Sequence, residues 1–412
     1  MGFSYQNKTL HCDQVSLADI AASAGTPCYV YSAEDILERY HAYDQAFGDH
    51  PHQVCYAVKA NSNLSLLRLL AAAGAGFDIV SGGELYRVLQ AGGDPEKTVF
   101  AGVGKTADEI EYALANKIHT FNCESEAELE LIDCLARKHG VTARVGLRVN
   151  PDVDASTHPY ISTGLREHKF GVDISEVEEV YSRAKRLANI ALEGVSCHIG
   201  SQLLDTDPMM ETVDKMLLLV GRLRANGIPI KHLDLGGGLG VAYKPQDRAP
   251  GITEVVAAIG CKVEGHNLKI MVEPGRSIVG AAGVLLTKVL FRKQTPRKEF
   301  LIVDAAMNDL IRPALYQSHH EIIPVEEPRA EQPMLADVVG PVCETGDFLA
   351  RNREMPPVLP GALLSINTAG AYGFVLSSNY NSRPRVPEVL VEGATWRIIR
   401  RRETLEDMIR GE

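Results

Sequence analysis

Short apolar, β-favouring runs recur along the first two thirds of the chain, and each ends in a polar or glycine-rich junction. Such runs bounded by turn residues are typical of buried strands. They predict eight strands: Val54–Val58, Phe77–Val80, Thr98–Ala101, Thr120–Cys123, Arg144–Val149, Leu192–Cys197, His232–Leu235 and Leu268–Val272. Helical patterns fill the gaps, for example at Leu64–Ala73, Ala107–Leu114, Glu124–Lys138 and Met209–Asn226. The alternation favours a (β/α)8 TIM barrel over an open doubly wound sheet, which need not stop at eight strands.

After Ser277 this alternation ends, and the remaining pattern is that of an antiparallel β-domain. Strand-like segments separated by Gly and Pro turns occur at Val284–Phe291, Phe300–Val303, Met334–Val339, Ala362–Ile366 and Glu388–Val391. The β-rich run Pro27–Tyr31 precedes the first barrel helix and is assigned to the same domain. The sequence therefore predicts a barrel over 34–280 and a mainly antiparallel, sandwich- or barrel-like β-domain over 1–33 and 281–412. The longest gap between barrel strands, which includes His158–Val172, predicts an extra loop over the barrel mouth.

Charge and cysteine usage narrow the classes of function. The 412 residues carry a net charge of −11 without a basic block, which argues against nucleic acid or an anionic membrane as partner. The eight cysteines form no CxxC pair, so neither a disulfide framework nor a zinc site is expected. The N-terminus has no apolar signal-like stretch, and no apolar run approaches the length of a membrane span. We therefore expect a cytoplasmic protein without metal.

Lys59 is the first residue along the chain whose side chain could take part in a reaction. It follows the apolar run Val54–Val58, and Asn61-Ser62-Asn63 then turns the chain into a helix. A lysine partly withdrawn from water is more easily deprotonated, and a neutral amine can form a Schiff base with a carbonyl. Read alone, Lys59 is more simply a surface lysine at a strand–loop junction, so the interpretation depends on the residues that follow.

Three further junctions supply complementary groups. Gly236, Gly237 and Gly238 follow the seventh predicted strand, where barrels commonly bind phosphate, although a tight turn would need the same glycines. Glu273 and Arg276 follow the eighth strand. They could pair with each other, or Glu273 could keep a heterocyclic nitrogen protonated while Arg276 binds an anion.

The junction after the sixth strand adds His198 and Ser201. His198 is either structural or stacked on a planar ring, and Ser201 could contact a phosphate. A Schiff-base lysine, a phosphate cradle and a carboxylate for a pyridine nitrogen together describe pyridoxal 5′-phosphate (PLP) as the cofactor.

These residues also resemble a known family. Tyr56–Asn61, His198–Gln202, Gly236–Gly240 and Glu273–Arg276 are similar to the motifs of fold type III PLP-dependent decarboxylases, which have an alanine-racemase-like barrel followed by a β-domain. The resemblance spans nearly the whole chain. It implies that Lys59 carries PLP, that Glu273 contacts the ring nitrogen, and that His198, Ser201, the three glycines, Gly275 and Arg276 bind the cofactor.

The β-domain motifs resemble the diaminopimelate decarboxylase branch: Arg312-Pro-Ala-Leu-Tyr316, Gly340-Pro-Val-Cys343-Glu344-Thr-Gly-Asp347 and Gly370-Ala-Tyr372-Gly373. The resemblance implies a homodimer with shared sites, in which Cys343 of one subunit protonates the carbanion and Glu344 binds the distal amino group. Arg276, Arg312 and Tyr316 would hold the distal carboxylate, and Tyr372 would contact cofactor and substrate. The implied reaction converts meso-2,6-diaminopimelate to L-lysine and CO2, the last step of lysine biosynthesis.

Physical chemistry supports this branch. The distal end of meso-diaminopimelate carries both an ammonium and a carboxylate, which require an acid beside arginines. Ornithine or arginine would present a cation alone. Rival hypotheses are a relative that acts on D-amino acids or on a carrier-linked glutamyl group, a racemase, and a PLP-binding protein without turnover. Glu273 argues against a racemase, in which an arginine is expected at the ring nitrogen. Lys59 and Cys343 argue against an inactive homologue.

Overall fold

The computed structural model describes residues 2–153, 169–328 and 332–412, and its contacts divide the chain into two compact units. The barrel unit contains Arg39–Gly240 and Ala249–Ser277, and the β unit contains Met1–Glu38, Val241–Arg248 and Ile278–Glu412. Most of the loop predicted at 158–172 lies outside the described residues. Within the described ranges, no helix is both long and apolar enough to span a membrane.

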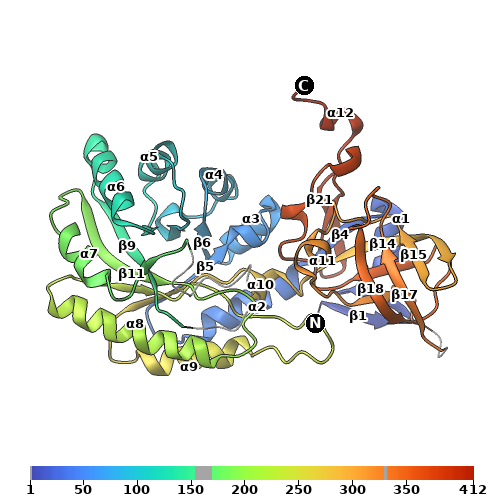
Figure 1. Ribbon diagram of the computed structural model, residues 1–412, viewed down its shortest axis with the longest axis horizontal. Helices are drawn as coiled ribbons and strands as arrows, with labels where there is room; N and C mark the ends of the chain where they lie inside the picture. Colours follow the sequence, from blue (N-terminus) through green and yellow to red (C-terminus); the bar gives the residue numbers. More distant parts are fainter. Residues whose placement is uncertain (1, 154–168, 329–331) are drawn as a thin grey trace. The chain divides into compact units, whose positions relative to one another are not determined.

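The barrel unit is a closed ring of eight parallel strands (Figure 1). Strand β5 pairs with β6 on one side and with β13 on the other, and β8 pairs with β9, which closes the ring. The short strand β10 (Val172–Asp173) pairs with the end of β9. The barrel strands are β5 (His52–Ala57), β6 (Gly76–Ile79), β7 (Thr98–Phe100), β8 (Thr120–Cys123), β9 (Ala143–Asn150), β11 (Ile190–Cys197), β12 (His232–Asp234) and β13 (Lys269–Val272). This confirms the predicted (β/α)8 fold class.

Helices connect consecutive strands and begin and end on local sequence signals. Thr106 and Glu109 form a capping box at the start of α5, and Ser125 caps α6, which ends on the left-handed Gly140. The barrel helices are α3 (Leu64–Ala72), α4 (Gly82–Gln90), α5 (Ala107–Ala115), α6 (Glu126–His139), α7 (Val177–Ala184), α8 (Asp207–Ala225) and α9 (Ile252–Val263). Helix α2 (Ala33–Ala46) and the short α10 (Arg276–Val279) each contain a boundary between the units. One-turn helices η1 (Val58–Ala60) and η2 (Pro95–Lys97) complete the unit.

The β unit is built on the sheet β18-β17-β15-β14-β4-β20-β21, with β19 joining β14 to β16 (Figure 1). Most pairs are antiparallel, whereas β15–β17 and β20–β4 are parallel. Its strands are β1 (Phe3–Gln6), β2 (Thr9–Cys12), β3 (Val15–Ser16), β4 (Cys28–Ser32), β14 (Gly283–Gln294), β15 (Glu299–Val303), β16 (Ile322–Pro324), β17 (Met334–Val339), β18 (Phe348–Met355), β19 (Leu363–Ile366), β20 (Glu388–Glu392) and β21 (Thr395–Arg400). Short helices are α1 (Leu17–Ala24), α11 (Arg312–Tyr316), α12 (Leu405–Met408), η3 (Phe374–Leu376) and η4 (Tyr380–Ser382).

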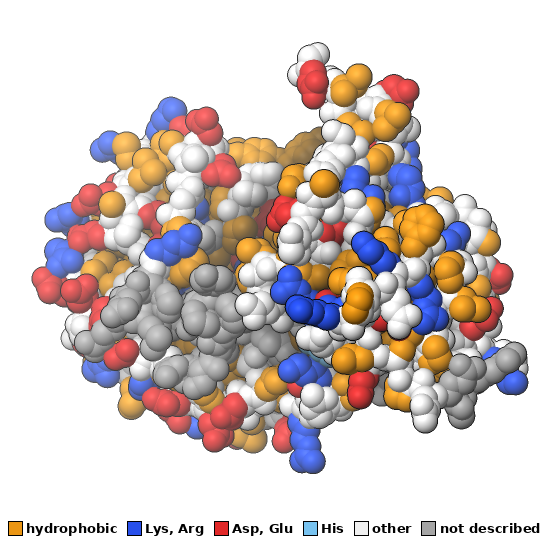
Figure 2. Space-filling view, turned by 45° about the vertical axis from the view of Figure 1, so that its right-hand side comes forward, with side chains coloured by type: hydrophobic (Ala, Val, Ile, Leu, Met, Phe, Trp, Pro, Cys, Tyr) orange, Lys and Arg blue, Asp and Glu red, His pale blue; other side chains and the backbone are white. Residues whose placement is uncertain are grey.

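The N-terminal run joins the β unit as a strand. β4 lies between β14 and β20, so a segment from the start of the chain occupies the middle of a sheet made otherwise from its last third. The segment Val241–Arg248 is also part of this unit, although it falls inside the range 34–280 predicted for the barrel. On the face shown in Figure 2, acidic and basic side chains are interspersed.

Candidate functional site

Lys59 lies in the one-turn helix η1, two residues after β5 ends at Ala57. The loop after β13 packs directly on this turn: Ala57 N–H donates to Pro274 O with an N···O distance of 3.0 Å. A Cβ at Gly275 would lie 2.9 Å from the Ala60 Cβ, so only glycine allows this approach. The Lys59 ammonium pairs with the fully buried Asp78 at the end of β6. The first and last strands of the barrel thus fix the Lys59 backbone together.

A cavity of about 440 Å³ opens beside Lys59. Its lining comes from the ends of several strands and the loops that follow them, as expected for the functional end of a barrel. The lining residues are Lys59, Val80, Ala101, Gly102, Val103, Gly104, Asn122, Arg148, Phe170, Ser196, Cys197, His198 and Glu273. Three residues predicted from separate motifs, Lys59, His198 and Glu273, therefore share one cavity.

Glu273 belongs to a buried cluster of polar side chains. The Asn122 amide donates to Asp234 Oδ2 at 2.9 Å and to Glu273 Oε1 at 3.4 Å, and the two carboxyl groups are hydrogen-bonded to each other. Burial raises the pKa of Glu273 well above its ordinary value, and the charges of Asp234 and Asp78 raise it further. Asn122 and Asp234 were not among the predicted site residues, because neither lies in a recognisable motif.

The three glycines after β12 form a loop whose backbone conformation and close contacts exclude residues with a side chain. Gly236 and Gly238 have φ values of 66° and 109°, and a Cβ at Gly237 would lie 2.3 Å from Glu273 O. Gly237 N–H donates to His198 Nδ1 at 3.3 Å, which identifies Nδ1 as the acceptor. Burial lowers the pKa of His198 well below its ordinary value, with the positive charges of Arg148 and Lys59 adding to the effect. The neutral imidazole is thus a flat wall of the cavity next to the glycine loop.

Arg276 and Ser201 meet next to this loop. The Arg276 Nη2 donates to Ser201 Oγ at 3.1 Å, and the arginine is buried although it carries a charge. From the sequence alone, Glu273 and Arg276 could have formed an ion pair with each other. The Glu273 contacts described above are instead with Asp234 and Asn122. A buried guanidinium beside a glycine loop suits an anion.

Arg148 lines the cavity on a different side. Its Nη1 donates to Glu124 Oε1 at 3.1 Å, and its guanidinium lies 4.6 Å from the centre of the Phe170 ring. Glu124 Oε2 also accepts the Gly171 N–H at 2.7 Å. Ion pair and ring together fix the guanidinium at the cavity wall.

In the β unit, Arg312 is buried at the start of α11 and contacts the side chains of Tyr243, Ser318 and His320. It donates to the Tyr243 hydroxyl at 2.8 Å and to Ser318 Oγ at 3.3 Å, and its Nη1 lies 3.1 Å from His320 Nε2. The guanidinium also stacks on the Tyr243 ring, 4.7 Å from its centre. Tyr243 belongs to the segment 241–248, which explains why that segment groups with the β unit. Tyr316, at the other end of α11, is half-buried.

Cys343 and Glu344 lie on an exposed loop between β17 and β18. Asp347 anchors the loop by accepting the backbone N–H groups of Val342 and Met307, each at 2.7 Å. A second segment holds the motif itself: Asn381 Oδ1 accepts the Cys343 N–H at 2.8 Å, and the Tyr380 hydroxyl donates to Glu344 Oε2 at 2.7 Å. The thiol and carboxylate are therefore pre-positioned on the surface of the unit.

Tyr372 has a backbone φ of 55°, in the left-handed region that aromatic residues rarely adopt. Its neighbours explain how the turn is held, because a Cβ at Gly370 would lie 1.9 Å from Val279 O, and one at Gly373 would lie 2.5 Å from Ala369 O. Backbone conformations of this kind concentrate at ligand sites. The half-buried Tyr372 is thus held in an unusual conformation by two obligatory glycines.

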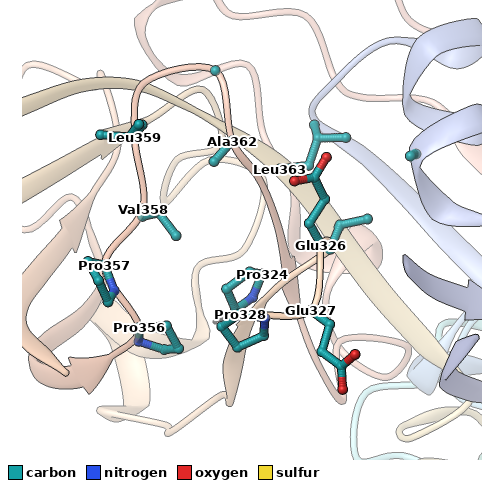
Figure 3. A pocket seen from close by; sticks show the side chains of 13 residues that line it. Pro324, Glu326, Glu327, Pro328, Pro356, Pro357, Val358, Leu359, Ala362 and Leu363 are labelled. Carbon is teal, nitrogen blue, oxygen red and sulfur yellow. The ribbon is translucent and has the colours of Figure 1, made fainter. Parts of the chain in front are cut away.

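The β unit also contains a cavity of about 600 Å³ under the turn before β19 (Figure 3). Prolines and aliphatic side chains make up most of its wall, with Glu326 and Glu327 at its edge. None of the predicted site residues lines it. We assign it no role in the chemistry.

Comparison with known proteins identifies the family. Residues 33–280 match the model of the pyridoxal-dependent decarboxylases, pyridoxal binding domain. The chain is 54% identical to the diaminopimelate decarboxylase of Pseudomonas aeruginosa, covering 100% of this chain and 98% of the relative. The chain belongs to the diaminopimelate decarboxylase family. It is 52% identical to the enzyme of Vibrio cholerae, over 98% and 97% of the two chains.

Solved structures agree. The diaminopimelate decarboxylase from Helicobacter pylori, complexed with L-lysine, aligns with a TM-score of 0.91 at 43% identity, covering 95% of this chain and 98% of that one. The enzyme from M. jannaschii aligns with a TM-score of 0.94 at 38% identity, over 99% and 96% of the chains. Like other members of this family, the chain is a PLP-dependent carboxy-lyase.

The cavity fits PLP in its donor set. Among the described residues, Asn122 Oδ1, Arg148 Nη2 and Ser196 Oγ are buried polar atoms without a hydrogen-bond partner, and all three residues line the cavity. Polar atoms in such positions call for a polar ligand. Lys59 supplies an amine, Glu273 a carboxyl group, and the glycine loop with Arg276 and Ser201 an anion site. No group of three or more potential metal ligands occurs among the described residues.

Proposed function

We propose that this diaminopimelate decarboxylase family member converts meso-2,6-diaminopimelate to L-lysine and CO2, the last step of lysine biosynthesis. The observation that carries the proposal is that Lys59, His198 and Glu273 line one cavity at the end of the barrel strands. When bound there, PLP supplies a conjugated ring that accepts the electron pair left on carbon as CO2 departs. The names of the relatives that align over the whole chain support the choice of substrate.

The barrel unit supplies the residues that hold the cofactor. Lys59 provides the amine that attaches it, and Glu273 provides the carboxyl group for the ring nitrogen. The backbone of Gly236, Gly237, Gly238 and Gly275, with the side chains of Ser201 and Arg276, receives the phosphate. The neutral His198 ring would offer the pyridine an uncharged flat surface, since an imidazolium at that place would oppose the positive charge of the protonated ring.

The β unit supplies the groups that select the substrate. The distal carboxylate of diaminopimelate requires cations, which Arg276 and Arg312 provide together with the Tyr316 hydroxyl, and the distal ammonium requires an acid, which is Glu344. The contacts of Arg312 with Tyr243, His320 and Ser318 set the plane of its guanidinium. Tyr372 contributes its hydroxyl to cofactor and substrate.

The protein acts as a cytoplasmic homodimer with shared sites, in which Cys343 and Glu344 serve the site of the partner subunit. Their exposure within a tightly anchored loop supports this arrangement, because an exposed pair that is held in place is suited to contact a second molecule. Cys343 then gives its proton to the carbon from which CO2 has left. The division of labour follows the proposed domains, 34–280 for the cofactor and 1–33 with 281–412 for substrate and dimer contacts.

The test is to measure CO2 and L-lysine release from meso-diaminopimelate in the presence of PLP. L-ornithine, L-lysine, L-arginine, D-ornithine and D-lysine serve as a matched panel, since each lacks the distal carboxylate. We expect turnover of diaminopimelate alone. If the protein binds PLP but turns over only a D-amino acid or a carrier-linked glutamyl group, the cofactor assignment stands and the proposed substrate is wrong.

A further inference from the structure

Asp234, the last residue of β12, contacts both the glycine loop and Glu273. Its Oδ1 accepts the Gly236 N–H at 2.9 Å, and its Oδ2 accepts the Asn122 amide at 2.9 Å. The hydrogen bond between its carboxyl group and that of Glu273 completes the cluster. Asp234 and Glu273 are only 1% and 8% exposed. Two carboxyl groups this close and this dry cannot both be ionised without a large cost in free energy.

The donors around Asp234 indicate where the proton of the pair lies. Asp234 receives two N–H donors, one on each oxygen, which favours its ionised form. Glu273 receives only the longer Asn122 contact of 3.4 Å among the hydrogen bonds described for its carboxyl oxygens, besides the bond to Asp234. The arrangement is therefore an Asp234 carboxylate that accepts the O–H of a protonated Glu273.

We propose that Asp234 is a positioning residue that keeps one proton on the Glu273 side of this buried pair, so that the site holds the proton required by the pyridine nitrogen of PLP. The inference rests on the proposed function for the identity of the ligand. When the nitrogen lies beside Glu273, the Glu273 O–H bond can break as an N–H bond forms at the ring. Proton and charge are conserved within the site, so no proton needs to enter from water.

The surroundings keep the pair isolated from other titrating groups. Asp78 and Lys59 are the charged side chains that act on Glu273 besides Asp234, and they are paired with each other. The thiols of Cys55 and Cys197 lie close enough to feel both carboxyl groups, and burial raises the pKa of each thiol, so both stay neutral. A change in Asp234 should therefore be transmitted mainly to Glu273 and to the nitrogen beside it.

The test is the protonation state of the ring nitrogen in the holoenzyme, measured by NMR with ¹⁵N-labelled PLP as a function of pH. The isosteric Asp234→Asn keeps an acceptor for Gly236 but removes the negative charge. We expect it to lower the apparent pKa of the nitrogen by at least about one unit, a tenfold change in proton affinity. Glu273→Gln should lower it further. An unchanged titration in Asp234→Asn, with Glu273→Gln shifted, would show that Asp234 has only a structural role.

Infrared spectroscopy of the protein without cofactor gives an independent measurement that needs no variant to be active. At pH 8 we expect the C=O band of a protonated carboxylic acid in the wild type, lost in Glu273→Gln and shifted in frequency in Asp234→Asn, where the acceptor of the Glu273 O–H changes from a carboxylate to an amide. Glu84→Gln is the matched control, because burial raises the Glu84 pKa to about 7 and its band should already be absent at pH 8. Absence of the band in the wild type, or an unshifted band in Asp234→Asn, contradicts the proposal. These results are independent of diaminopimelate turnover, so failure of the proposed substrate can be told apart from failure of the proton pair.

Discussion

The barrel unit and the β unit hold their candidate residues in opposite ways. In the barrel, Glu273 and Arg276 are buried and follow directly from strands whose positions the whole barrel fixes. In the β unit, Cys343 and Glu344 are exposed and depend on a few local contacts with Asp347, Tyr380 and Asn381. The barrel residues are thus fixed by burial in the fold as a whole, whereas the Cys-Glu loop is fixed by a few contacts at the surface.

Replacing Lys59 should have the largest effect. Lys59→Ala removes the amine, and Lys59→Arg keeps a cation beside Asp78 but cannot form a Schiff base with PLP. We expect both variants to lose more than about 10⁴-fold in turnover, at or beyond what one proton-transfer group contributes, together with the visible absorption of the bound cofactor. Lysine release and absorption spectra check this. Because Lys59→Arg preserves the ion pair, its thermal stability should remain close to that of the wild type, and residual turnover in it would contradict the role of Lys59.

Replacing Cys343 tests whether the exposed loop acts in another subunit. Cys343→Ala should lower kcat by about 10²- to 10⁴-fold with little change in KM, because it removes a proton donor and not a binding group. Mixed in equal amounts with Lys59→Ala, it should recover up to about a quarter of native activity, since half of randomly formed dimers contain one intact shared site of two. Cys261→Ala, at another exposed cysteine, is the control and should remain active. Mixed dimers without recovered activity would contradict the shared site.

The acid sensitivity of the barrel gives a comparison based on stability. His119 and His232 face each other with ring centres 5.6 Å apart, and burial lowers their pKa values to about 4 and about 3, with the charge of Lys269 contributing. Below their unfolded pKa of about 6.5 the unfolded chain binds more protons than the folded one, so this contribution to stability is lost as pH falls.

His232→Phe removes one of these titrations, and we expect it to move the acid unfolding of the barrel to lower pH. Helical circular dichroism should show the shift, because the long helices belong to the barrel. Fluorescence of Trp396, the single tryptophan and a residue of the β unit, should change at the same pH as in the wild type. The exposed His266→Gln is the control. A Trp396 transition that moves together with the helical signal would show that the two units unfold as one.

How much the sequence predicted also differs between the units. All eight barrel strands were predicted close to their observed bounds, because parallel strands buried on both faces have strong apolar runs. In the β unit, β1, β2, β3, β16, β18 and β21 were missed. β18 and β21 are edge strands with mixed, partly exposed residues, and each pairs with a single neighbour, β17 or β20. Edge strands with charged residues lack the pattern that identifies central ones.

The site shows the same limit. Residues in motifs, such as Lys59 and Glu273, were identified from the sequence, and the structure brings them to one cavity. Asn122 and Asp234 were not, since a single buried asparagine or aspartate at a strand end resembles any structural polar residue. Tyr243, the partner of Arg312, comes from a segment assigned by sequence to the barrel range. Such contacts arise only when distant parts of the chain are folded together.

Tyr380 is another residue that no motif identified, and its replacement should have the smallest effect. Its hydroxyl donates to Glu344, and this hydrogen bond raises the Tyr380 pKa. Tyr380→Phe leaves the ring and removes one hydrogen bond from the carboxylate proposed to bind the distal ammonium. We expect KM for diaminopimelate to rise about two- to tenfold, the range for loss of a single hydrogen bond, with kcat nearly unchanged.

Steady-state kinetics with the exposed Tyr86→Phe as control would measure this effect. A fall in kcat at constant KM would instead implicate Tyr380 in proton transfer by the neighbouring Cys343, because both are tied to the same segment through Asn381. A rise in KM confined to Tyr380→Phe would mean that the exposed loop, unlike the barrel site, depends on a single surface hydrogen bond for the orientation of its acid. That outcome would make local anchoring, and not burial, the source of substrate recognition in the β unit.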